Sequence, residues 1–323
     1  MIISASRRTD VPAFYSDWFY NRLREGFVVT QNPFNANQLS KLRLDAAVVD
    51  AIVFWTKNAT PMLKRLDELD KSGIAYYFQY TITPYGKDLE LRLPDDKTGL
   101  IETFRTLSSR IGQDRVIWRY DPILFSDKYT MGFHKRAFER CASLLEGYTK
   151  RVVISYLDMD YNNTKTINNL GIRDGSTEEK NEIAAYIGEV AAHFGMEVET
   201  CAEEIDLEAC GIKHGQCVDA DLIEKITGRQ LLPKGKEKDK SQRLLCGCVA
   251  STDIGVYNTC LHGCSYCYAN YSQGTIQGNC AKHDPSSPLL IGSCNAEELC
   301  FKKDQKSFFD GSLQPDQLSI FDE

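Results

Sequence analysis

Runs of apolar residues alternate with amphipathic stretches along the first 200 residues of the chain. The apolar runs predict strands at residues 1–6, 27–31, 51–55, 75–83, 116–120, 151–156 and 197–200. Three stretches between them carry apolar residues at helical spacing and predict helices over residues 60–72, 98–111 and 177–194. A glycine follows each of these helices, as is common at helix ends: Gly73, Gly112 and Gly195.

Strands that alternate with helices predict an α/β fold with a parallel sheet, because parallel strands need a crossover connection. We expect a full or partial (β/α) barrel of the TIM type, with an open, doubly wound sheet as the alternative. The predicted domains are a barrel-like domain over residues 1–205, a cysteine-rich region over 206–305 that closes the barrel mouth, and a flexible tail over 306–323.

Polar residues follow several predicted strands, at the end of the sheet where barrel enzymes carry their chemistry. Together they predict the rim of a pocket, although each taken alone is equally explained as an ordinary loop residue. The segment 32–35, which follows the second predicted strand, belongs to this rim. The candidates for catalytic or anchoring roles are Arg7, Arg8, Asp10, Lys57, Arg119 and Asp121.

Composition narrows the class of protein. With 42% hydrophobic residues the 323-residue chain can form a large core, and its net charge of −7 argues against nucleic-acid binding through overall charge. No apolar run is long enough to span a membrane and no signal segment opens the chain, so we expect a cytoplasmic protein with no membrane contact. Of the 12 cysteines, all but Cys141 lie between Cys201 and Cys300. In a reducing compartment such density favours metal-binding or catalytic thiols over disulfides.

Three cysteines, Cys260, Cys264 and Cys267, have the spacing C-x3-C-x2-C. Thiolates are soft ligands that bind iron–sulfur clusters and zinc. Three thiolates would leave one iron of a 4Fe–4S cluster open to a substrate or cofactor. Gly263 gives this loop backbone freedom, and Tyr266 places an aromatic ring beside the last cysteine.

The segment YNTCLHGCSYCYAN resembles the signature of the radical S-adenosylmethionine superfamily, above all the subgroup that contains spore photoproduct lyase. The resemblance implies that Cys260, Cys264 and Cys267 hold a 4Fe–4S cluster, with Tyr266 among the cofactor-binding residues. It also implies that S-adenosylmethionine binds the open iron and that a ferredoxin or flavodoxin supplies one electron, which releases a 5′-deoxyadenosyl radical. In most of the superfamily the motif follows the first strand. Here it follows the predicted barrel, which makes residues 206–305 the iron–sulfur region.

Nearly the whole chain resembles the family known as domain of unknown function 1848. The resemblance is carried by SASRRTDVPAFY, NPFN, FWTKN, TITPYG, WRYDPI and CAEEIDL, and by the CGC and DIGVYNTCLHGCSYCYAN segments. It implies no particular reaction.

A second metal site is suggested by the remaining cysteines. The four thiolates of Cys201, Cys217, Cys246 and Cys248 would suffice for a second iron–sulfur cluster or a structural zinc. Cys210 could replace one of them. The alternative is that these are scattered thiols that bind no metal.

The tail carries a short apolar segment, QLSIF, from Gln317 to Phe321. It resembles the peptide by which many bacterial DNA-maintenance proteins dock on the sliding clamp. The simpler alternative is a tail that folds back and buries its apolar side chains.

These features favour a radical S-adenosylmethionine enzyme with an unknown substrate, for which a nucleic-acid-related molecule is one option. The first alternative is an iron–sulfur protein for electron transfer or redox sensing, which would not need a polar barrel mouth. The second is a zinc-stabilised nucleic-acid-binding protein, which would require paired C-x2-C units and a basic face.

Overall fold

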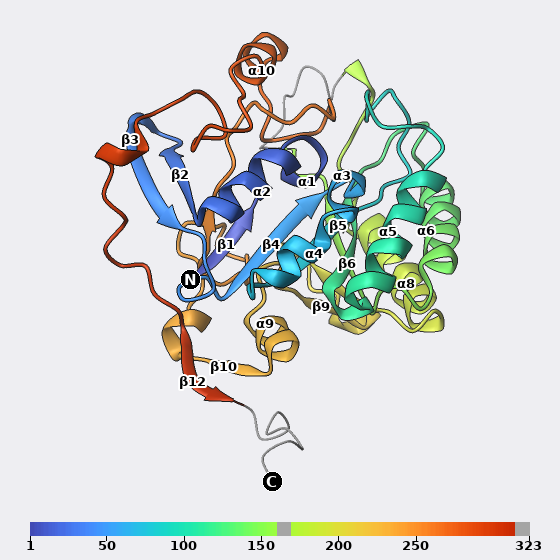
Figure 1. Ribbon diagram of the computed structural model, residues 1–323. Helices are drawn as coiled ribbons and strands as arrows, with labels where there is room; N and C mark the ends of the chain where they lie inside the picture. The colour runs from blue at the N-terminus through green and yellow to red at the C-terminus, as the bar shows by residue number, and fades with distance from the viewer. Residues whose placement is uncertain (160–168, 314–323) are drawn as a thin grey trace.

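The computed structural model describes residues 1–159 and 169–313, and its main feature is an eight-stranded parallel sheet with helices packed against it (Figure 1). The strand order is β11-β1-β4-β5-β6-β7-β8-β9. The strands are β1 (Ile2–Ala5), β4 (Ala51–Thr56), β5 (Ala75–Thr81), β6 (Val116–Ile123), β7 (Arg151–Tyr156), β8 (Glu197–Thr200), β9 (Ile212–His214) and β11 (Thr252–Asp253).

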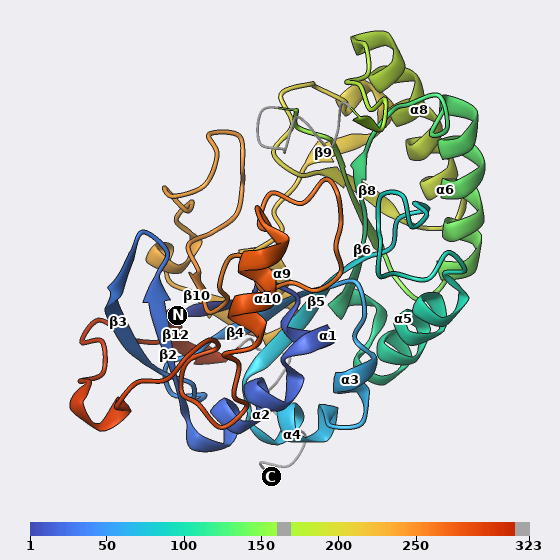
Figure 2. The ribbon, with the colours of Figure 1, turned by 90° about the horizontal axis from the view of Figure 1, so that it is seen from above.

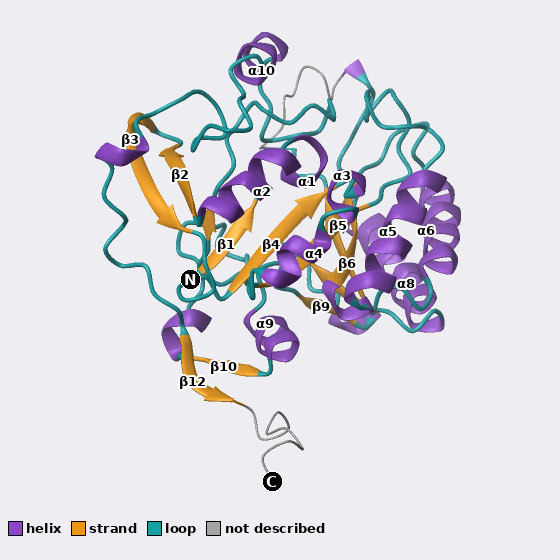
Figure 3. Ribbon diagram, viewed as in Figure 1, coloured by secondary structure: helices purple, strands orange, loops and turns teal. Residues whose placement is uncertain are grey.

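The helices that connect the strands from β4 to β8 lie on the outer side of this sheet (Figure 2). Seen from above, the strands from β4 to β9 follow a curved line, with the helices α3, α5, α6 and α8 outside it (Figure 2). Loops and α10 lie above the carboxyl ends of β1 and β4 (Figure 3). The helices are α1 (Val11–Phe14), α2 (Ser16–Glu25), α3 (Thr60–Leu63), α4 (Leu66–Lys71), α5 (Thr98–Ile111), α6 (Met131–Leu145), α8 (Thr177–His193), α9 (Ala220–Thr227) and α10 (Gln273–Cys280).

The predicted α/β class with a parallel sheet is confirmed. A closed barrel is not found in the described part of the chain, because β9 and β11 form the two edges of the sheet and do not pair there. Both edge strands lie beyond residue 205, so the predicted cysteine-rich region contributes to the same sheet as the first 205 residues. The predicted domain boundaries stay a prediction.

The helix predictions succeed where start and stop signals are local. The helix α5 covers residues 98–111, and α8 begins at a capping box in which the Ser176 side chain and the Glu179 carboxylate bond each other's backbone N–H groups. The predicted helix over 60–72 is instead divided into α3 and α4. The break falls at Arg65 (φ −124°, ψ 14°), whose guanidinium packs over the Tyr20 ring.

The predicted second strand is real but lies outside the main sheet. β2 (Phe27–Asn32) pairs with β3 (Asn35–Arg43) in an antiparallel hairpin, and the segment 32–35 forms its turn. The side chain of Asn32 accepts a hydrogen bond from the Phe34 backbone N–H, and Phe34 is 96% exposed. Residues 32–35 therefore do not belong to a pocket rim. A second short hairpin joins β10 (Arg229–Leu231) to β12 (Phe309–Leu313).

Alternate strand residues enter two separate cores, as expected when both faces of a parallel sheet are covered. One set packs under the helices and includes Ile3, Phe54, Phe78, Trp118 and Ile154. The other faces the concave side and packs on residues 217–249, and it includes Ile2, Val53, Tyr77, Ile117 and Val153. In the described residues no helix is both long and apolar enough to cross a membrane.

Candidate functional site

Asp10 joins the end of β1 to residues 260–267, the segment with Cys260, Cys264 and Cys267 that we call the cysteine loop. Its Oδ1 accepts a hydrogen bond from the Ala13 backbone and caps α1. Its Oδ2 accepts a hydrogen bond from the Lys57 backbone N–H at 2.7 Å and lies 2.7 Å from Nε2 of His262. The first and third predicted strands thus deliver their loops to the motif 260–267.

Glu90 is the centre of a buried charge network beside this loop. Its carboxylate is 1% exposed and pairs with Nζ of Lys57 at 2.7 Å and with Nζ of Lys97 at 2.9 Å. It also accepts hydrogen bonds from the hydroxyls of Thr83 and Tyr266. Burial alone would raise the pKa of Glu90, but the two ammonium groups outweigh burial and lower this pKa to about 2.

The cysteine loop is fixed to the segment that carries Glu90. Ser265 donates a backbone hydrogen bond to the Leu89 carbonyl, and Arg92 donates one to the His262 carbonyl. Gly263 has a left-handed backbone (φ 70°), which allows the chain to turn between the first two cysteines. The Tyr266 ring packs edge-on against Tyr85, so the aromatic residue of the motif is held in a small apolar cluster.

Cys260, Cys264 and Cys267 lie within eight residues on one loop. Burial raises the pKa of all three, and the charges of the other two raise the pKa of Cys260 further. The pKa of Cys264 rises to about 12, although Lys57 opposes the rise. A bound metal would stabilise the thiolate forms that burial disfavours, so this donor set fits a positively charged group. In the described residues no three His, Cys, Asp or Glu side chains already surround a common point as metal ligands do.

Arg119 and Asp121 lie in the middle and second half of β6, between the cysteine loop and a second group of thiols. Arg119 pairs with Asp121, which also accepts a hydrogen bond from the Ser155 hydroxyl. Burial alone would raise the pKa of Asp121, but Arg119 and, more weakly, Lys57 hold it below its usual value. Arg119 also contacts Sγ of Cys217 at 2.8 Å. The predicted rim residues Lys57, Arg119 and Asp121 therefore form one line of buried charges.

The two arginines after β1 point to different places. The Arg7 guanidinium packs 5.1 Å from the centre of the Trp55 ring, and its Nη1 donates to the Ser251 hydroxyl at 3.4 Å. Arg8 instead contacts the Gly255 carbonyl and the Tyr257 ring.

The four cysteines predicted for a second metal site lie in one region. Sγ of Cys217 lies 3.6 Å from Sγ of Cys201, and Cys217, Cys246 and Cys248 belong to one buried cluster against which Cys201 packs. Cys210 lies elsewhere, with its thiol 4.0 Å from the Asn181 carbonyl.

Sequence reasoning missed several residues of this region. Glu90 and Lys97 lie in a segment with no periodic pattern, and nothing in the sequence marks them as a buried pair. Cys280, which belongs to neither predicted cysteine group, approaches the cysteine loop: its Sγ is 3.5 Å from the Thr259 carbonyl and 3.4 Å from the Tyr15 hydroxyl.

The protein is therefore an α/β protein with an open parallel sheet. Two groups of cysteines and a line of buried charges lie toward the carboxyl ends of its strands. The chain belongs to the family described as Domain of unknown function (DUF1848), whose model matches residues 2–269. No curated protein matches the chain. One solved structure, of a candidate alpha-L-fucosidase from Bacteroides thetaiotaomicron VPI-5482, is similar over 50% of this chain at 11% identity and a TM-score of 0.26. The match spans 64% of that protein's chain.

Proposed function

We propose that this protein is a radical S-adenosylmethionine enzyme whose reaction takes place at the carboxyl ends of the parallel strands. The observation that carries the proposal is that Cys260, Cys264 and Cys267 lie within eight residues on one loop, whose Tyr266 ring has Nζ of Lys57 5.7 Å from its centre. Three thiolates suit a 4Fe–4S cluster with one iron open, and a protein that only carries electrons has no need of an open iron.

The cluster, when bound, would supply the electron that cleaves S-adenosylmethionine into methionine and a 5′-deoxyadenosyl radical. The chain's own residues have other tasks. Lys57, held by Glu90, places a positive charge beside the thiolates, and Tyr266 and Tyr85 exclude water from one side of the loop. Asp10 fixes His262 and therefore the loop itself.

Glu203 and Asp121 provide polar groups for a substrate. Burial is the largest influence on Glu203 and, with the charges of Asp121 and Cys201, it raises the pKa of this carboxyl to about 7. A carboxyl that titrates near neutrality can hold or release a proton at its Oε atoms during a reaction. The Tyr156 backbone N–H donates to Oε1 and orients it.

The proposal includes a one-electron reductant such as a ferredoxin or flavodoxin as partner and a cytoplasmic location. It leaves the substrate open. A nucleic-acid-related substrate and docking on the sliding clamp rest on the sequence resemblances alone, and the segment 317–321 lies outside the described residues.

The test uses full-length protein that is purified and reconstituted without oxygen. Iron and sulfide content and the EPR spectrum of the reduced protein are recorded with and without S-adenosylmethionine, and 5′-deoxyadenosine is then assayed. We expect an EPR signal that changes with S-adenosylmethionine and product formation that disappears in Cys260→Ala. The matched control is Cys300→Ala, which removes an exposed thiol and should leave both readouts unchanged.

Two outcomes would reject the proposal. Iron and sulfide without any response to S-adenosylmethionine would instead indicate an electron-transfer or redox-sensing protein. Protein that takes up no iron at Cys260, Cys264 and Cys267 would leave the third function, a zinc-stabilised nucleic-acid-binding protein.

A further inference from the structure

The second group of thiols is assembled from three separate segments. Cys201 directly follows β8, Cys217 follows β9, and Cys246 and Cys248 precede β11. Sγ of Cys201 lies 3.6 Å from Sγ of Cys217, and Sγ of Cys248 accepts a hydrogen bond from the backbone of Val218, the residue after Cys217. Cys217, Cys246 and Cys248 belong to one buried cluster, and Cys201 packs against it. Three of the four are nearly or fully buried, and Cys201 is half-buried.

We propose that Cys201, Cys217, Cys246 and Cys248 bind one zinc ion. A tetrahedral zinc with Zn–S bonds of about 2.3 Å places its sulfur ligands about 3.8 Å apart. The Sγ atoms of Cys201 and Cys217 are 3.6 Å apart, which is close to this spacing and far longer than a disulfide bond of about 2.05 Å. In a 4Fe–4S cluster each thiolate binds a different iron, so the four sulfurs lie farther from one another. The short contact therefore favours a single ion.

The described structure does not hold a completed ligand shell, so the proposal requires the thiols to turn toward one common ion. Zinc commonly completes such sites as it binds, since ligand deprotonation and metal binding are coupled.

The surroundings match the charge that this site would carry. Four thiolates and one Zn²⁺ have a net charge of −2, and two arginine side chains lie in this region. Nη1 of Arg119 is 2.8 Å from Sγ of Cys217, and Nη2 of Arg7 is buried with no hydrogen-bond partner among the described residues. Both guanidinium groups also pack on the Trp55 ring, at 5.2 and 5.1 Å from its centre. The Val218 backbone N–H donates to Sγ of Cys248, a contact that orients thiolate ligands in metal sites.

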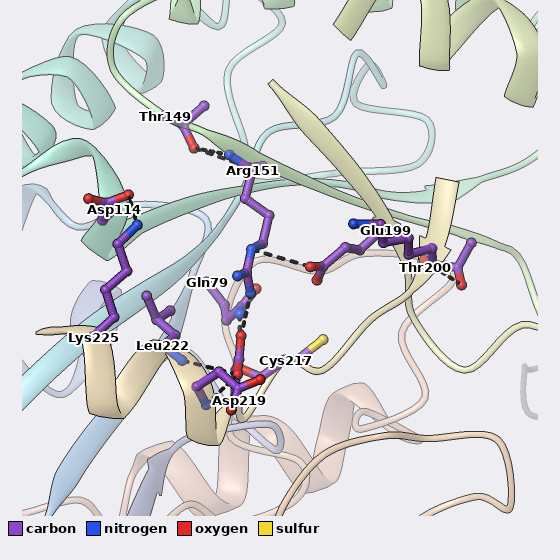
Figure 4. Close-up of polar contacts among 12 residues, drawn as sticks. Gln79, Asp114, Thr149, Arg151, Glu199, Thr200, Cys217, Asp219, Leu222 and Lys225 are labelled. Carbon is purple, nitrogen blue, oxygen red and sulfur yellow. Dashed lines mark hydrogen bonds and ion pairs between the residues drawn. The ribbon is translucent and has the colours of Figure 1, made fainter. Parts of the chain in front are cut away.

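The position of the site gives it a structural role. β9 and β11 are the two edges of the open sheet, and the segments next to them meet through a hydrogen bond from Val249 to the Val218 carbonyl. The Cys217 segment is held on the concave face by Tyr77 and Gln79, which both donate to the Cys217 carbonyl. Figure 4 shows Arg151 reaching from β7 to Asp219 beside Cys217. A zinc ion bound here would join the two edges of the sheet.

The test measures zinc and iron per chain in full-length protein purified without chelator. We expect close to one zinc per chain, a loss of about tenfold or more in Cys217→Ser and in Cys248→Ser, and no loss in Cys300→Ser. Cys264→Ser should keep its zinc, so this site and the proposed radical function succeed or fail separately. If the variants do not fold, Co²⁺ is exchanged into the wild-type protein, where four thiolates should give strong sulfur-to-cobalt charge-transfer bands and tetrahedral ligand-field bands.

Three results would overturn the zinc site. The first is wild-type protein that contains no zinc and gives no tetrahedral cobalt spectrum. The second is a Cys217→Ser variant that loses iron and sulfide rather than zinc. The third is a disulfide between Cys201 and Cys217, detected by mass spectrometry of unreduced peptides.

Discussion

Oδ2 of Asp10 and Nε2 of His262 lie 2.7 Å apart although 252 positions separate the two residues in the chain. This contact fastens the cysteine loop to the end of β1, and both side chains are almost fully buried. Because the same carboxylate holds the Lys57 backbone, one side chain sets the position of the loop relative to two strands.

We therefore expect Asp10→Ala to loosen the cysteine loop and to lower the free energy of unfolding by about 1–3 kcal/mol, as unpaired buried donors do. The thiols of Cys260, Cys264 and Cys267 should then react faster with a thiol reagent in the metal-free protein. The control is Asp45→Ala, which removes a partly exposed partner of Arg43. Labelling of Asp10→Ala at the wild-type rate would contradict the assigned role.

Glu90→Gln should be strongly destabilising, because it leaves the ammonium groups of Lys57 and Lys97 buried without a counter-charge. Removal of one partner from a buried ion pair costs about 3–5 kcal/mol. Urea denaturation measures the loss, and Glu102→Gln, which breaks an exposed pair with Arg105, serves as control with a change below about 1 kcal/mol. Similar midpoints for the two variants would refute the charge network.

We expect the buried His134 to make the free energy of unfolding depend on pH. Its ring is fully buried, with Nε2 2.8 Å from the Leu124 carbonyl and Nδ1 2.9 Å from the Tyr120 hydroxyl, and burial lowers its pKa to about 4. As the pH falls from about 6.5 to about 4, the unfolded chain binds a proton that the folded chain does not, so stability decreases by up to about 3 kcal/mol.

The measurement is the free energy of unfolding between pH 7.5 and pH 4, which brackets the window from about 6.5 to about 4. His134→Gln should flatten this slope, whereas His193→Gln, on the exposed end of α8, should keep it. An unchanged slope in His134→Gln would show that other groups cause the acid sensitivity.

Two helix glycines should respond to alanine in opposite ways. At Gly188 in α8 a Cβ would lie 2.2 Å from the Cys210 carbonyl oxygen, so Gly188→Ala should destabilise by about 1–3 kcal/mol. At Gly99 in α5 a Cβ meets nothing within 4 Å, so Gly99→Ala should stabilise by up to about 1 kcal/mol. Thermal unfolding distinguishes the two, and equal shifts would contradict the packing of α8 on the Cys210 segment.

The parts of the fold that sequence predicts well are those with local causes. The bounds of α5 follow from an apolar stripe that ends before Gly112, and those of α8 from the capping box at Ser176. The pattern of β2 predicts a strand correctly, but alternation does not encode the partner, and the partner is β3 rather than the main sheet. β11 has two residues, too few for any periodic signal.

The same limit applies to the candidate site. Cysteine spacing identifies the thiols of the loop, because the motif lies within eight residues. Glu90 becomes visible only in three dimensions, since its partners Lys57, Lys97 and Tyr266 come from three different segments. The contact between Cys201 and Cys217 likewise depends on the placement of β9 beside β8.

The pairing of β12 with β10 places the end of the described chain on one side of the molecule. This hairpin lies below the sheet in Figure 1, whereas α10 and the loops around the thiols lie above it. A partner protein that binds this hairpin would therefore be held away from those loops.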